Sequence, residues 1–185
     1  MHISRHISRY TKRCSAFRAA LVYAALGSTP AMAQQTGPDV LSETYRDWVV
    51  VCQTADAQND GQGIRVCEMK QELRQQESGQ RVLSVALRPE EDAGAAFLTL
   101  ITPFGLRVAE HIQIAVDEVP VLETPFQTCL PQGCIVQTRL DQAAIDAMQR
   151  GEAAIVSLPT NSGDQFQITI SLLGFAAAWN RLSDL

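Results

Sequence analysis

Short apolar runs separated by turn-forming residues dominate the chain from residue 44 onwards. The run Tyr45–Cys52 is rich in β-branched and aromatic residues and is apolar on both faces, which predicts a central strand. Ala95–Thr102 is almost unbroken in its apolar character and predicts a strand buried on both faces. The other runs with a strand-like pattern are Ile64–Leu73, Val82–Leu87, His111–Val116, Val121–Cys129, Ala153–Leu158 and Phe166–Leu172.

The pattern changes from period two to a helical period in one segment. Residues 141–150 place Ala144, Ile145 and Met148 on a single stripe, with Asp141 suited to cap the first turn. Phe175–Trp179 predicts a short helix or tail whose aromatic side chains cover the end of the core. Eight or so strands with frequent turns, mostly antiparallel, predict an all-β sandwich with one short helix and a helical C-terminal tail.

The first 33 residues differ in composition from the rest. They contain five basic residues and no acid, then an apolar run from Ala19 to Leu26, and end in Ala31-Met-Ala33. This order is typical of an export signal cleaved after Ala33. The apolar run is shorter than the roughly 20 residues that span a bilayer, so no integral membrane anchor is expected. We predict residues 1–33 as signal, 34–43 as a flexible arm, 44–185 as one domain, and a periplasmic or secreted location.

Removal of the signal changes the charge of the chain. All 20 acidic residues but only ten of the 15 Lys and Arg lie after residue 33, which gives a net charge of about −10 with His neutral (10 basic minus 20 acidic). Nucleic acids and anionic membrane surfaces bind basic patches. The composition therefore predicts no nucleic-acid partner.

Four cysteines follow the signal, at Cys52, Cys67, Cys129 and Cys134. Four cysteines permit three pairings, and the two local pairs are favoured because each joins neighbouring strand-like runs. In Phe126–Thr138 a Pro-Gln-Gly turn brings Cys129 and Cys134 face to face. Half of a zinc site is the alternative, but metal pairs usually have two to four residues between the cysteines and recruit two further ligands. Spacings of 14 and four residues also differ from the two of a thioredoxin-type dithiol.

The sequence contains few candidates for catalysis. His111 is the one histidine after residue 33, and the alternation of its strand places it on the polar face, exposed and without a partner. No nucleophile elbow, phosphate loop, dinucleotide fingerprint or zinc-protease helix is present. We therefore predict no catalytic residue, no metal and no cofactor. A periplasmic enzyme that uses a pair of carboxylates stays open as the alternative.

Several motifs taken in order resemble one family. They are Asp47-Trp48-x-Val50-x-Cys52, Val66-Cys67-Glu68-Met69, Leu98-Thr-Leu-Ile-Thr-Pro-Phe-Gly105, Phe126-Gln-x-Cys129-Leu-Pro-x-Gly-Cys134 and Ser171-Leu-x-Gly174-Phe175. Together they resemble the invasion-associated locus B (IalB) family over about residues 44–180. The resemblance implies an exported bacterial protein with an immunoglobulin-like β-sandwich, associated in pathogenic members with entry into host cells, and without known catalytic residues. It favours a binding module with a protein or envelope partner.

The signal prediction is tested by the intact mass of the protein recovered from the cell envelope fraction. We expect a mature chain that begins at Gln34, because Ala31 and Ala33 supply the small residues that signal peptidase requires. A soluble, folded product that retains residues 1–33 would contradict export through this segment.

Overall fold

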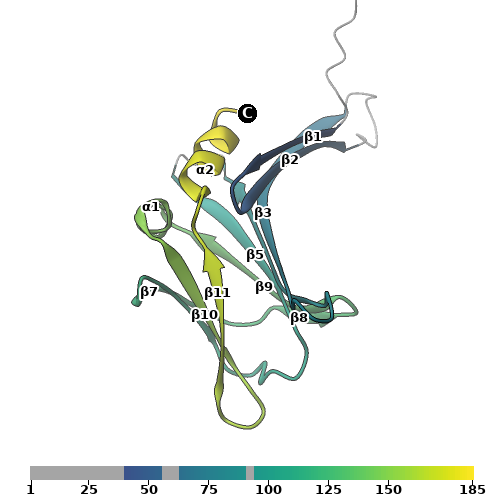
Figure 1. Cartoon of the computed structure of the whole chain (residues 1–185), viewed down its shortest axis with the longest axis vertical. Helices are drawn as coiled ribbons and strands as arrows, with labels where there is room; N and C mark the ends of the chain where they lie inside the picture. The colour runs from purple at the N-terminus through teal and green to yellow at the C-terminus, as the bar shows by residue number, and fades with distance from the viewer. Residues whose placement is uncertain (1–39, 56–62, 91–93) are drawn as a thin grey trace, which may run out of the picture. The chain divides into compact units, whose positions relative to one another are not determined.

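The computed structural model describes residues 40–55, 63–90 and 94–185, which form two antiparallel sheets. The larger sheet has seven strands in the order β1-β2-β3-β4-β5-β9-β8, and the smaller has four in the order β11-β10-β6-β7 (Figure 1). The strands are β1 Val40–Tyr45, β2 Trp48–Ala55, β3 Ile64–Arg74, β4 Arg81–Pro89, β5 Ala96–Thr102, β6 Ile112–Val116, β7 Val119–Thr124, β8 Thr128–Leu130, β9 Gly133–Leu140, β10 Ala153–Pro159 and β11 Gln165–Ser171. The predicted β-sandwich is confirmed.

The amino-terminal strand corrects the predicted arm. Residues 40–43 belong to β1, which pairs with β2 along its whole length, and a reversal at Arg46 (φ 56°) separates the two strands. The run predicted as one strand from Tyr45 to Cys52 therefore begins at Trp48. Sequence reasoning missed β1 because it is an edge strand with no fully buried side chain, so it lacks a strong apolar alternation. Residues 1–39, which include the predicted signal, lie outside the described residues.

The prediction for Ala95–Thr102 was right about the strand and wrong about its burial. In β5 the side chains of Ala96, Leu98 and Leu100 are buried between the sheets, whereas Phe97 and Thr99 are half-buried on the outer face. The threonine is compatible with this partly solvated surface. β5 thus has the single buried face of an ordinary antiparallel strand.

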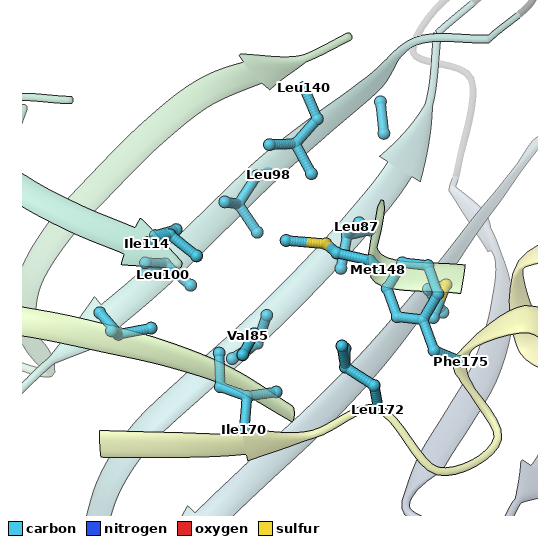
Figure 2. Packing of buried hydrophobic residues seen from close by; sticks show 14 of the residues in the cluster. Val85, Leu87, Leu98, Leu100, Ile114, Leu140, Met148, Ile170, Leu172 and Phe175 are labelled. Atoms are coloured by element: carbon cyan, nitrogen blue, oxygen red, sulfur yellow. The ribbon is translucent and has the colours of Figure 1, made fainter. Parts of the chain in front are cut away.

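The core lies between the sheets and consists of inward-facing aliphatic residues of both. Figure 2 shows Val85, Leu87, Leu98 and Leu100 of the larger sheet opposite Ile114 and Ile170 of the smaller one. At one end the ring of Trp48 meets the ring of Phe175 edge-on, with centroids 5.1 Å apart. Edge-to-face contacts of this kind are favourable beyond the area that they bury.

Two helices cover the end of the core. α1 (Gln142–Arg150) buries Ala144, Ile145 and Met148, as its apolar stripe predicts. The carboxylate of Asp141 accepts a hydrogen bond of 2.9 Å from the Ala144 N–H and so caps the first turn.

α2 (Phe175–Ser183) is longer than the predicted tail and buries Phe175, Ala178, Trp179 and Leu182. Its two aromatic side chains cover the end of the core, as the sequence predicts. Gly174 precedes the helix with a φ of 89°, and a Cβ at this position would overlap the Tyr45 carbonyl oxygen. Only glycine therefore allows α2 to begin this close to the β1–β2 turn.

A buried polar junction joins the two sheets at Ser171, the last residue of β11. The Ser171 carbonyl accepts hydrogen bonds from Trp48 Nε1 (2.9 Å) and from Gln71 Nε2 (3.1 Å). The Ser171 N–H donates to Gln71 Oε1 (3.2 Å), and Gln71 Nε2 also donates to the Asp47 carbonyl (3.1 Å). The Gln71 side chain is 8% exposed and pairs with β11 much as a neighbouring strand would.

Gln71→Leu tests the junction. The substitution keeps the side chain's approximate volume but leaves the Ser171 N–H without its partner in a buried place, so we expect a loss of about 1–3 kcal/mol in the free energy of unfolding. Urea denaturation measures this loss. Gln113→Leu, at an exposed position of β6, is the matched control and should change little. Equal stabilities of the two variants would show that the junction contributes nothing.

Candidate functional site

The two disulfides join Cys52 to Cys67 and Cys129 to Cys134, the local pairs that the sequence favours. Each bond links directly opposed residues of adjacent strands, β2 with β3 and β8 with β9. Cys52 and Cys134 are buried, whereas Cys129 is exposed at the edge of the larger sheet. The second disulfide therefore fastens a short edge hairpin whose outer side faces solvent.

His111 directly precedes β6, and its side chain is 54% exposed, as predicted. The expectation that it has no partner was wrong, because its Nδ1 lies 3.9 Å from Glu123 Oε1 of β7. The register of β6 against β7 brings these two residues together, and strand pairing is not visible in the local sequence. Within the described ranges, no group of three or more His, Cys, Asp or Glu side chains is arranged to hold a metal ion.

The clearest electrostatic cluster joins β1 to α2. The Arg181 guanidinium contacts both carboxylate oxygens of Glu43, at 2.7 and 3.1 Å, and the Tyr45 hydroxyl donates to the same carboxylate at 3.0 Å. The hydrogen bond from Arg181 lowers the pKa of Glu43, followed by that from Tyr45. Partial burial, then the hydrogen bond to Glu43, raises the pKa of Tyr45. A carboxylate stabilised in its charged form is suited to anchoring the helix, and a general acid would need the opposite shift.

A hollow with both polar and apolar lining lies beside the β8–β9 hairpin and has a volume of about 340 Å³. We call it the hairpin-end hollow. It is lined by Gln80, Arg81, Ile101, Thr102, Pro103, Phe104, Pro131, Gln132 and Gly133. Figure 1 shows β8 beside β9, with the end of β5 close by. Three segments far apart in the sequence thus meet here.

Several contacts fix the wall of the hairpin-end hollow. The Thr102 hydroxyl donates to the Cys134 carbonyl at 3.0 Å, and the Arg81 guanidinium donates to the Gln132 carbonyl. Gly133 has a φ of 142°, and a Cβ there would overlap the Thr102 carbonyl oxygen. Glycine is therefore required for the hairpin to approach β5. Together with the disulfide, these contacts hold the turn in one conformation.

Two large apolar side chains are exposed at this place. Phe104, which lines the hollow, is 62% exposed, and Leu130, which directly precedes the lining residue Pro131, is 44% exposed. Sequence reasoning missed both as functional candidates. The available signal was a phenylalanine between Pro103 and Gly105, since turns are usually polar and an aromatic residue there has no strand face to bury.

Two other hollows have fewer polar side chains in their lining. One of about 300 Å³ lies on the outer face of β2 and β3, lined by Val51, Gln53, Thr54, Val66 and Glu68. A cavity of about 10 Å³ lies inside the apolar core, between residues such as Leu98 and Ile170 (Figure 2). It has room for about one water molecule and has no polar lining that would hold one. Of these three, the hairpin-end hollow is the best candidate for a functional site, because it combines polar lining with an exposed phenylalanine.

These features define a class of protein: an antiparallel β-sandwich with two cross-strand disulfides and an exposed apolar site at one hairpin. A sequence profile of the family described as invasion associated locus B (IalB) protein matches residues 48–183. The chain belongs to this family, as the motifs in the sequence indicate.

Individual relatives agree with this assignment. The chain is 35% identical to a Brucella abortus protein described as an invasion protein B homologue over 177 residues, which cover 94% of this chain and 98% of the relative. It is 30% identical to invasion protein B of Bartonella bacilliformis over 154 residues, or 80% of this chain and 78% of the relative. The crystal structure of invasion associated protein B from Bartonella henselae matches with a TM-score of 0.68 and 27% identity, over 78% of this chain and 95% of that one.

The pair Glu43 and Arg181 predicts a pH dependence of stability. Because the pKa of Glu43 is lowered by folding, its contribution is present above the ordinary value of 4.5 and is lost as the pH falls through the lowered value. We expect the wild type to melt above Glu43→Gln at about pH 7, and the gap to close as the pH falls below 4.5 and through the lowered pKa of Glu43. Glu77→Gln, an exposed position without an ion pair among the described residues, is the control. A gap that stays constant with pH would contradict this role of the ion pair.

Proposed function

We propose that this protein is an exported binding module that engages a protein partner through the surface formed by Phe104, Leu130 and the hairpin-end hollow. The single observation that carries the proposal is the exposure of two apolar side chains at the hollow: Leu130, in the hairpin that the Cys129–Cys134 disulfide closes, and Phe104, in the lining of the hollow beside that hairpin. Burying such residues against a partner gains apolar contact, and a fixed turn loses little conformational freedom on binding. Arg81 and Gln132 at the same place supply polar groups for orientation.

Export to the periplasm or beyond fits several features. The basic and apolar segment ending at Ala33 has the order of a cleaved signal, and disulfides persist in oxidising compartments. Among the residues that the structure describes, no helix is long and apolar enough to cross a membrane.

A role at the surface of a host cell is the finer form of the proposal. The relatives from Brucella abortus and Bartonella bacilliformis are described as invasion proteins or their homologues. We propose by analogy that the partner of this chain belongs either to a host cell or to the bacterial envelope. An apolar site on a module with a negative charge of about 10 after the signal would suit a partner with an apolar patch and a basic rim.

The carboxylate enzyme is the second candidate, and it has less support. It requires two acids in a hollow with pKa values shifted apart. None of the hollows described above is lined by two acidic side chains. We therefore propose that the protein works by binding without turnover, with no cofactor.

The binding site is tested by replacing Phe104 and Leu130 with serine together. Because both side chains are exposed, the free energy of unfolding should change by less than about 0.5 kcal/mol each. Capture of the partner from intact cells by crosslinking should fall by at least about tenfold, since apolar anchors provide most of the energy of an interface. Mass spectrometry of the crosslinked product measures the loss and names the partner.

Two control variants sharpen this test. Val119→Ser removes another exposed apolar side chain, 64% exposed on β7, and should leave capture unchanged. His111→Ala should leave both capture and melting unchanged. Undiminished capture by the double variant would show that the partner binds at another surface. Loss of function in His111→Ala at an unchanged melting temperature would indicate chemistry at His111.

A further inference from the structure

The sheets have four edge strands, and three of them carry features that discourage pairing with another strand. β7 contains Pro120 and faces a register shift in β6. β8 has three residues and is followed by Pro131. β1 places the charged Glu43 on its inward face, where it pairs with Arg181. These three edges are poor templates for a further strand.

The edge formed by β11 is different. Its sequence is Gln165-Phe-Gln-Ile-Thr-Ile-Ser171, seven residues with no charge and no proline, and its pairing with β10 has no register shift. Figure 1 shows β11 at the border of the smaller sheet, with the turn to β10 at its far end. A long, neutral and regular edge strand is the kind that pairs readily with another chain.

The hydrogen bonds identify which main-chain groups of β11 are free. The Thr160 N–H donates to the Asp164 carbonyl and the Leu172 N–H donates to the Glu152 carbonyl, so even-numbered positions bond toward β10. Because bonding alternates along an antiparallel ladder, the N–H and C=O groups of Gln165, Gln167 and Thr169 point outward. Within the described part of the chain these groups have no partner, whereas the outward groups of Ser171 bond to Gln71 and Trp48.

These free groups are arranged symmetrically about Gln167. If a second copy of β11 runs antiparallel with Gln167 opposite its own counterpart, Gln165 of each copy lies opposite Thr169 of the other. All three outward positions are then paired, and each pair exchanges two main-chain hydrogen bonds. The main-chain groups of Ser171 take no part in this pairing, so their hydrogen bonds to Gln71 and Trp48 stay intact.

The same register improves the apolar contacts on the inner side of the strand. It places Phe166, which is 43% exposed, opposite Ile168 of the other copy. Pairs of aromatic and β-branched residues across strands are favourable. The exposed Phe166 side chain of each copy is thus covered by Ile168 of the other copy.

Charge favours this surface for contact between two identical chains. With about −10 on the part after the signal, two copies repel each other unless a neutral surface lies between them. β11 is neutral throughout, and its neighbour β10 presents the neutral Ser157 and Ile155 on the outer face beside Gln167 and Thr169. A two-fold contact uses the same patch on both copies, as closed homodimers require.

We propose that a second copy of this chain binds the free edge of β11, so that the two smaller sheets join into one continuous antiparallel sheet with Gln167 on the two-fold axis. This contact is separate from the hairpin-end hollow and does not depend on the proposed function.

Charge substitutions at Gln167 test both the partner and the register. The disulfide-bonded chain as recovered from the producing cells should show twice the chain mass by light scattering, in a concentration-dependent way. Gln167→Lys alone and Gln167→Glu alone place like charges opposite each other and should each weaken the dimer by at least about tenfold. A mixture of the two variants should restore a mixed dimer, because opposite charges then meet on the axis. Gln113→Lys, on the outer face of β6 away from the edge, should dimerise normally.

Amide hydrogen exchange tests the same contact in the wild-type chain, without a substitution. The N–H groups of Gln165, Gln167 and Thr169 should exchange more slowly as protein concentration rises, while those of Phe166 and Ile168 are already protected by β10. The proposal is overturned by a monomer at the highest soluble concentration. It is also overturned by a dimer that is indifferent to Gln167→Lys and to Gln167→Glu, or by these three amides staying unprotected in a dimer.

Discussion

The hydrogen bonds at Ser171 are the constraint on which the arrangement of the two sheets depends. An amide side chain carries the same donor and acceptor as a peptide group, so Gln71 can close the end of β11 without a further strand. The contact fixes where β11 stops and where the chain turns toward α2. The Asp47 N–H then donates to the Leu173 carbonyl, and Gly174 packs on the Tyr45 carbonyl. These two contacts hold the start of α2 over the core. Losing one partner leaves buried main-chain groups unpaired.

Much of the fold can be predicted from the sequence because its signals are local. The strands with strong alternation, the helix capped by Asp141 and the turn between Cys129 and Cys134 all follow from neighbouring residues. β1 cannot be found this way, because an edge strand needs no apolar face. The sequence indicates that Gln71 shares a strand face with Cys67 and Met69. It does not indicate the partner of Gln71, because Ser171 lies 100 residues away.

The candidate site shows the same limit more sharply. The cysteine pairing could be predicted from the turn, since the bond spans five residues. The presence of Phe104 and Pro131 in the lining of one hollow depends on β5 pairing with β9, a contact between segments that no local pattern connects. The contact between His111 and Glu123 was missed for the same reason. The sequence indicates single residues that stand out, such as Phe104 and His111. Their neighbours in space depend on strand pairing, which local patterns do not show.

The separation in sequence of the contacts at Ser171 has a consequence for the order of events during synthesis. The chain emerges from the ribosome with its amino-terminal end first, and Trp48 and Gln71 are made long before the residue that they bind, 123 and 100 positions later. The hairpins closed by the disulfides span only 15 and five residues. Local hairpins can therefore form early, but the two sheets cannot be joined at this junction until Ser171 has been made. Until then, Trp48 Nε1 and the Gln71 side chain have no partner in the second sheet.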